Sequence, residues 1–175
     1  MNAELDPIVV RQGRATDGEV ILELWDIAIA WMVRRGQPGQ WGTEPASARA
    51  RTREMVESWL PEPGLRIAEI GGEPVGASVI VPTPPSHVPA TPLRETYLNF
   101  LISHRDHAGR GIGAELVRQA AADARAAGSE VLRVDCWAGA PALVDWYERQ
   151  GFVRSDTFTV DVRGPWHGQV FEMRL

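Results

Sequence analysis

Lysine is missing from the 175-residue chain, and all 18 of its basic residues are arginines. They are outnumbered by 23 aspartates and glutamates, which gives a formal net charge of −5. That balance argues against a nucleic-acid-binding protein, because such proteins usually present a basic face. The absence of lysine, together with abundant alanine, glycine and proline, suggests a GC-rich bacterial genome.

Cysteine and long apolar runs are scarce as well. Cys136 is the one cysteine, which excludes an intramolecular disulfide and fits a reducing compartment. Because it lies in an apolar run, we expect a packed thiol and not a nucleophile. No apolar segment approaches the roughly 20 residues that span a bilayer, and no signal peptide is visible. We therefore expect a cytoplasmic protein that has no membrane partner.

The hydrophobic and charged contents of 44% and 23% are ordinary for one globular domain, which we expect to span 1–175. Periodicity and turn signals predict strands at 8–12, 65–70, 75–81, 97–103, 132–136, 152–162 and 169–175, and helices at 16–36, 46–59, 113–127 and 141–151. The order is β-α-α-β-β-β-α-β-α-β-β. It predicts an α/β (α+β) fold with a mixed central sheet of about six to seven strands flanked by about four helices.

A glycine-rich loop joins the strand 97–103 to the helix that follows it. The loop contains Gly109, Arg110, Gly111 and Gly113. A glycine turn that opens a helix leaves backbone N–H groups unpaired, and the helix dipole adds positive potential at the same place. The loop therefore predicts a site for a phosphate or pyrophosphate group.

One alternative is a dinucleotide-binding domain. The spacing Gly109-x-Gly111-x-x-Ala114 matches a relaxed form of that fingerprint, and Asp135 on the next strand is placed like a ribose-binding acid. The motif lies late in the chain, however, and a hairpin precedes it. Too little sequence remains for the other parallel strands of a doubly wound sheet.

A second motif favours another interpretation. The helix that begins at Pro141 ends in Tyr147-Glu148-x-x-Gly151-Phe152. Together with the loop pattern at Ala108-x-x-Gly111-x-Gly113, it resembles the GNAT superfamily of acyl-CoA-dependent N-acetyltransferases. Two positions depart from the family pattern: Ala108 replaces a glutamine or arginine, and Ala140 replaces an asparagine found in many members.

The resemblance implies the GNAT fold and transfer of an acetyl group from acetyl-CoA to a primary amine, which we expect to belong to a small molecule. It implies that the cofactor is bound by Leu101, Ile102, Ser103, Ala108, Gly109, Arg110, Gly111, Ile112 and Gly113. Backbone N–H groups of the loop would hold the pyrophosphate, and that of Leu101 or Ile102 would face the thioester oxygen. Tyr147 matches the tyrosine that protonates the leaving thiolate.

The acceptor half of the site is less defined. Asn99 alternates with its neighbours on the strand and is expected to face the substrate, while Glu95 and Asp135 are candidate bases. Among seven tryptophans, we expect Trp31, Trp41 and Trp166, with Trp25, to line a substrate wall suited to a small cation or an aromatic amine.

Several expectations remain open at this stage. No histidine pair has metal-ligand spacing, so we expect no metal. A non-catalytic acyl-CoA-binding sensor or assembly module remains an alternative function. A homodimer formed through the C-terminal strands is possible.

Overall fold

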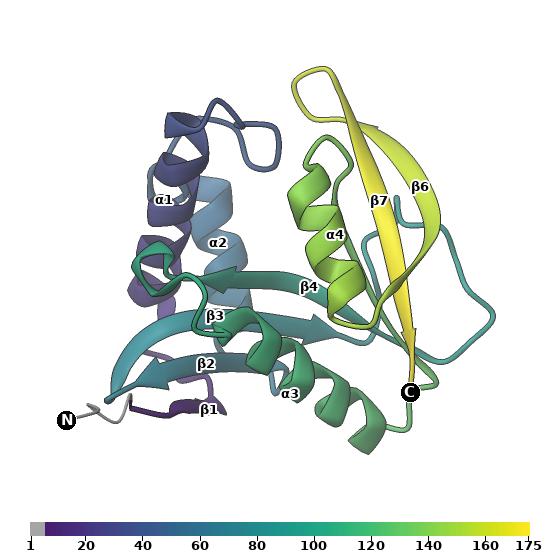
Figure 1. The fold of residues 1–175 in the computed structure, drawn as a ribbon, viewed down its shortest axis with the longest axis horizontal. Coiled ribbons are helices and arrows are strands. Elements are labelled where there is room, and N and C mark those ends of the chain that lie inside the picture. Colours follow the sequence, from purple (N-terminus) through teal and green to yellow (C-terminus); the bar gives the residue numbers. More distant parts are fainter. Residues whose placement is uncertain (1–5) are drawn as a thin grey trace.

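The computed structural model describes residues 6–175, and its strands form one seven-stranded sheet in the order β1-β2-β3-β4-β5-β7-β6 (Figure 1). The strands are β1 Ile8–Gln12, β2 Leu65–Ile70, β3 Glu73–Val81, β4 Glu95–Ser103, β5 Val131–Trp137, β6 Val153–Asp161 and β7 Pro165–Arg174. The helices are α1 Gly18–Arg34, α2 Ala50–Trp59, α3 Ile112–Ala126 and α4 Pro141–Arg149, with short 3-10 turns at Ala46–Ala48 and Arg105–His107. The predicted element order is confirmed.

The sheet divides between β4 and β5, its one parallel pair within residues 6–175. These two strands pair only at their start, through Glu95–Tyr97 and Val131–Arg133. Beyond Tyr97, β4 stays paired with β3, and beyond Arg133, β5 stays paired with β7. The facing edges of β4 and β5 therefore diverge and open a gap in the middle of the sheet. A sheet with one parallel pair is not doubly wound, which excludes the dinucleotide-binding fold.

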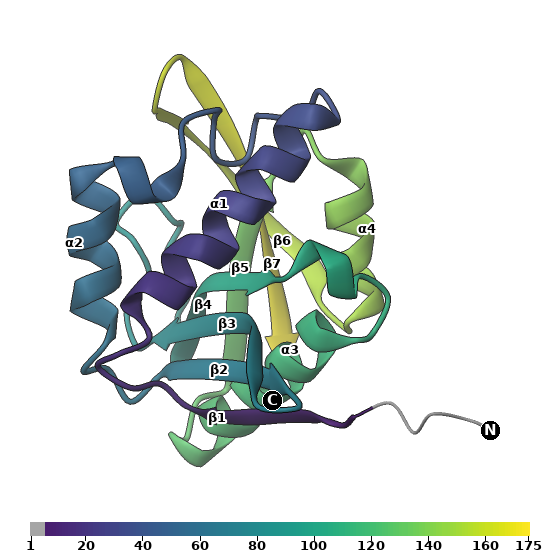
Figure 2. The same ribbon diagram turned by 90° about the vertical axis from the view of Figure 1, so that its left-hand side faces the viewer.

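Helices cover both faces of the sheet, as the side-chain alternation of β4 requires. Phe100 and Ile102 pack in a core with residues of α1 and α2, including Trp25. The intervening Leu101 packs with α3, against Leu116. Figure 2 shows α1 lying across the strands of the β1–β4 half. β4 is thus held from both sides where it lines the gap.

Several element boundaries differ from the predicted ones, among them the following three. β7 begins at Pro165 and not at 169, because proline is tolerated as the first residue of a strand. α2 begins at Ala50 because the preceding residues form a 3-10 turn, where the carboxylate of Asp26 accepts hydrogen bonds from the N–H and hydroxyl of Ser47. β4 begins two positions early, at Glu95, where it pairs with β5.

No helix within residues 6–175 combines the length and the apolar character that crossing a bilayer requires.

Candidate active site

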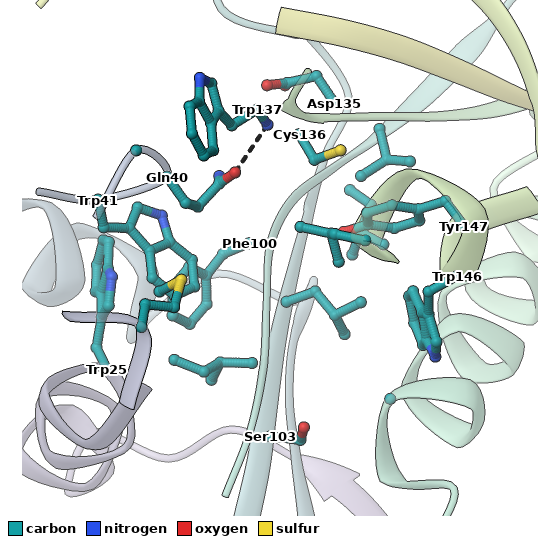
Figure 3. Close-up of a pocket in the computed structure, with 18 of the residues that line it drawn as sticks. Trp25, Gln40, Trp41, Phe100, Ser103, Asp135, Cys136, Trp137, Trp146 and Tyr147 are labelled. Carbon is teal, nitrogen blue, oxygen red and sulfur yellow. Dashed lines mark hydrogen bonds between the residues drawn. The ribbon is translucent and has the colours of Figure 1, made fainter. Parts of the chain in front are cut away.

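A cavity of about 1280 Å³ occupies the gap between β4 and β5. At one end it reaches the glycine loop and the start of α3. At the other end it reaches the segment between α1 and α2 and the β6–β7 hairpin. The side chain of Tyr147 on α4 faces the middle of the gap, as Figure 3 shows. Segments from most of the chain, from Trp25 to Trp166, therefore line the cavity.

The loop end of the cavity is built as an anion cradle. Gly109 and Gly111 have φ angles of 81° and 84°, in the left-handed region that favours glycine, and a Cβ added at either would meet no atom within 4 Å. Gly111 is the N-cap of α3 and supplies no side-chain cap, so the N–H groups of the first turn remain available. The loop thus combines open space, free donors and the positive end of a helix dipole.

Close packing fixes this cradle on the sheet. Gly76 of β3 lies under the first turn of α3, where an added Cβ would stand 2.7 Å from Ile112 and 3.0 Å from the carbonyl oxygen of Ile102. Gly113 lies against α4, where an added Cβ would stand 2.9 Å from the ring of Trp146. Small residues at these two positions let α3 approach both β3 and the helix that bears Tyr147.

The two arginines near the loop have different placements. The guanidinium of Arg110 donates to the carbonyl oxygen of Asp6 at 3.0 Å, and this residue does not line the cavity. Arg105 does line it, with its guanidinium 4.6 Å from the ring centroid of Trp31. The Nε of Arg105 is buried without a hydrogen-bond partner, and burial lowers the pKa of its guanidinium. The sequence pointed to Arg110 because that residue lies inside the motif, and it gave no signal for Arg105.

The β4 wall carries the other residues expected at the cofactor. Leu101, Ile102 and Ser103 line the cavity, as do Ala108, Gly109, Gly111, Ile112 and Gly113. Among residues 6–175, the edge of β4 that faces β5 has no strand partner beyond Tyr97. An unpaired strand edge offers backbone N–H and C=O groups to an extended ligand that contains amides. Asn99 is half-buried and also lines the cavity.

Tyr147 lines the opposite wall at the middle of the gap (Figure 3). Only 5% of the residue is exposed, and its ring packs against Phe152 and Phe171 with centroid distances of 5.8 and 5.3 Å. Burial, followed by the nearby Cys136 and Asp135, raises the pKa of the phenol above its usual range. The hydroxyl is therefore protonated at neutral pH and available as a proton donor.

Asp135 of β5 is the one carboxylate among the described residues that line the cavity. The Tyr97 hydroxyl donates a hydrogen bond to its Oδ1. Burial is the main cause that raises the pKa of the Asp135 carboxyl, against the lowering effects of the Tyr97 bond and of His87. A carboxylate with a raised pKa is a stronger base than one in water.

Glu95, the other candidate base, lies outside the cavity lining. Its carboxylate accepts a hydrogen bond at 3.0 Å from Arg133, whose side chain is 1% exposed. Arg133 also donates to the carbonyl of Pro89 at 2.9 Å and pairs with Asp156 at 3.4 Å. Glu95 is therefore the charge partner of the buried Arg133, at the point where β4 and β5 pair.

Aromatic rings form the wall of the cavity on its α1–α2 side. Trp25 lies 4.7 Å from Phe100 and 5.5 Å from Trp41, and Trp59 lies 5.0 Å from Phe100, measured between ring centroids. All four line the cavity, together with Trp137, Trp146 and Trp166. Trp31 does not: it lies between the guanidiniums of Arg35 and Arg105, each 4.6 Å from its ring.

Two hydrogen bonds hold the segment 37–42 across this end of the gap. The side chain of Gln40 accepts a hydrogen bond at 2.7 Å from the backbone N–H of Trp137 (Figure 3), and the indole of Trp166 donates to the carbonyl of Gly39 at 2.8 Å. Trp137 packs so closely that a Cβ on Gly39 or Gly139 would lie 2.3 Å from its ring. No local sequence pattern indicates that these segments meet.

The described residues contain no group of three or more potential ligands arranged to hold a metal ion. Cys136 is buried and unpaired, and burial raises the pKa of its thiol to about 12, which keeps it a poor nucleophile at neutral pH.

Comparison with known proteins identifies the fold and the family. A crystal structure of a GNAT-family acetyltransferase from Listeria monocytogenes matches with a TM-score of 0.72 and 21% identity, over 100% of this chain and 99% of that one. A putative acetyltransferase from Salmonella typhimurium, solved with its cofactor acetyl-CoA, matches with a TM-score of 0.68 and 14% identity, over 96% and 94%. A polyamine N-acetyltransferase from Drosophila melanogaster, described as forming N-acetylagmatine, matches with a TM-score of 0.64 and 19% identity, over 97% and 100%.

At these identities the structural matches establish the GNAT fold alone. No curated protein sequence matches the chain significantly. The family model for acetyltransferases of the GNAT family matches residues 23–152, which is more than half of the chain. The chain therefore belongs to the GNAT family of acetyl-CoA-dependent N-acetyltransferases.

Proposed function

We propose that this protein transfers the acetyl group of acetyl-CoA directly to a primary amine of a small molecule. The observation that carries the proposal is the gap between β4 and β5, which has an anion cradle at one end and Tyr147 on its wall. A phosphate-bearing cofactor with an extended amide arm fits that arrangement. The free N–H groups at the start of α3 suit the pyrophosphate, and the unpaired edge of β4 suits the arm.

In this reaction the amine nitrogen forms a bond to the thioester carbonyl carbon, the carbon–sulfur bond breaks, the nitrogen loses a proton and the sulfur gains one. The backbone N–H of Leu101 or Ile102 would stabilise the charge that develops on the carbonyl oxygen. Tyr147, kept protonated by burial, would donate a proton to sulfur and would be reprotonated by the proton that the amine nitrogen releases after attack. Asn99, on the lining of the same strand, would position the acceptor.

Tyr147→Phe tests the proposal because it removes one oxygen atom and leaves the ring packing in place. We expect the variant to bind acetyl-CoA with unchanged affinity by calorimetry. We expect kcat for CoA release, in the presence of an amine that the wild type acetylates, to fall about 100- to 10,000-fold. A wild-type protein that binds acetyl-CoA but acetylates no amine in a broad panel would instead favour the acyl-CoA-binding sensor.

Two expectations about cellular context stay predictions. A cytoplasmic location is supported by the buried and unpaired state of Cys136. A homodimer is supported by β6, an edge strand on which Val153 is 66% exposed. Sedimentation of the purified protein across a range of concentrations tests the second.

A further inference from the structure

We propose that the acceptor is a monoamine with an aromatic or bulky apolar body, whose ammonium group is bound and deprotonated by Asp135. This inference rests on the proposed function and defines its substrate class. Three features favour such an acceptor: the charges that line the cavity, the hydrogen bond that holds Asp135, and the aromatic wall across the gap.

The charges that line the cavity favour an acceptor with a single positive charge. Asp135 is the one carboxylate among the described lining residues, whereas the other charged lining residues are four arginines: Arg49, Arg105, Arg149 and Arg163. An acceptor with a second ammonium or guanidinium group would find no second carboxylate in the described lining. A diamine or agmatine is therefore disfavoured, in contrast to the Drosophila melanogaster structural neighbour, which is described as forming N-acetylagmatine.

Asp135 is held in place for one ligand. Within residues 6–175, its Oδ1 accepts the hydrogen bond from Tyr97, and no hydrogen bond is formed by Oδ2. Tyr97 is itself 1% exposed, so the carboxylate is anchored by a rigid donor. The free oxygen can accept a hydrogen bond from an ammonium group and then its proton, which releases a neutral amine for attack on the thioester. The proton passes from Asp135 to solvent when the product leaves.

The aromatic wall across the gap suits an apolar body. The rings of Trp25, Trp41, Trp59 and Phe100 pack against one another at 4.7 to 6.3 Å and form a continuous apolar wall. Met32 and Met55 also line this region, and methionine side chains adapt to ligands of varied shape. A ring or branched chain placed here would bury apolar surface on both partners.

The first experiment compares 2-phenylethylamine with agmatine and putrescine, measured by CoA release. We expect kcat/KM for 2-phenylethylamine to exceed that of either dication at least tenfold. We expect Asp135→Asn to lower kcat/KM for 2-phenylethylamine about 100-fold or more, while its affinity for acetyl-CoA stays unchanged. Asp145→Asn is the control, because Asp145 is exposed on α4, does not line the cavity, and its substitution changes the net charge equally.

The second experiment separates this inference from the proposed function. Six of the seven tryptophans line the cavity, so tryptophan fluorescence reports amine binding to the CoA complex without any turnover. We expect 2-phenylethylamine to change the emission of the wild type, and Trp41→Ala to weaken that binding at least tenfold. Trp31→Ala is the matched control, since Trp31 lies outside the cavity lining.

Binding that depends on Asp135 and Trp41 in a protein without turnover would retain the acceptor site and reject the proposed reaction. Turnover that prefers agmatine or putrescine would overturn the inference and leave the reaction intact. So would an Asp135→Asn variant whose kcat/KM equals that of Asp145→Asn.

Discussion

Gly111→Asp offers a sharp test of the cradle because the chain contains a matched control. Gly111 and Gly72 have φ angles of 84° and 85°, and an added Cβ at either meets no atom within 4 Å. Gly72 lies in the turn between β2 and β3 and does not line the cavity. Aspartate tolerates the left-handed region better than most residues. Each substitution should therefore cost a similar free energy of unfolding, about 1 kcal/mol.

The two variants should differ in their affinity for acetyl-CoA. At Gly111 the new carboxylate would stand where the cradle receives a phosphate group, whereas at Gly72 it would stand in solvent. Two unit charges 4 Å apart repel by about 4 kcal/mol at an effective dielectric constant of 20, and solvent at this exposed loop reduces the effect to about 2–4 kcal/mol. Since about 1.4 kcal/mol corresponds to a tenfold change, we expect binding to weaken roughly 30- to 1000-fold.

Calorimetric titration of acetyl-CoA into both variants and the wild type measures this difference. Thermal unfolding checks that the two substitutions cost similar stability. Because salt screens the repulsion, the loss of affinity for Gly111→Asp should shrink as ionic strength rises. If Gly111→Asp binds acetyl-CoA within threefold of Gly72→Asp, the loop does not hold the phosphates and the assignment of the cradle is wrong.

Three further predictions concern the scaffold. Gly76→Ala should cost about 1–3 kcal/mol in urea unfolding and weaken acetyl-CoA binding, because its Cβ would lie 2.7 Å from the first turn of α3. Glu95→Gln should lower the unfolding free energy by about 1–3 kcal/mol, because it weakens the pairing of the buried Arg133. We expect kcat to stay unchanged. A large fall in kcat without a loss of stability would instead indicate that Glu95 acts as a base. The pKa of Asp17 is lowered, chiefly by its hydrogen bond to Arg11. This pair therefore stabilises the fold above the unfolded-state pKa of about 3.9, and the stability is lost as the pH falls through the lower folded-state value. In urea unfolding at a series of pH values, Asp17→Asn should reduce the loss of stability at acid pH.

The glycine loop and its place at the start of α3 were predictable because backbone conformation encodes them. Glycines with positive φ, followed at once by a helix, form the cradle within a few residues of sequence, and no distant partner is needed to define it. The directions of the arginine side chains were not predictable in this way. Arg110 lies within the motif but points to Asp6, whereas Arg105 lies outside it and lines the cavity. The direction of a long side chain depends on neighbours that local sequence does not reveal.

The acceptor half depends on contacts between distant segments, which explains why it was harder to predict. Glu95 and Asp135 were equal candidates as bases, and only the register of β4 with β5 places Glu95 beside Arg133 and brings Asp135 to the cavity. The placement of the tryptophans depends on distant contacts for a similar reason. Trp31 was expected on the substrate wall but lies outside the cavity lining, whereas Trp137 lines the cavity because two glycines leave room for its ring.

The packing of α3 against α4 links the glycine loop to the helix that carries Tyr147. Gly113 belongs to the first turn of α3, which forms the cradle, and it contacts the ring of Trp146, the residue that precedes Tyr147. This helix–helix contact therefore contributes to the distance between the glycine loop and the tyrosine hydroxyl. Across the gap, the hydrogen bond between Gln40 and Trp137 contributes in the same way to the distance between Asp135 and the aromatic wall. A change at Gly113 should thus disturb proton transfer to sulfur, and a change at Gln40 should alter which amines are accepted.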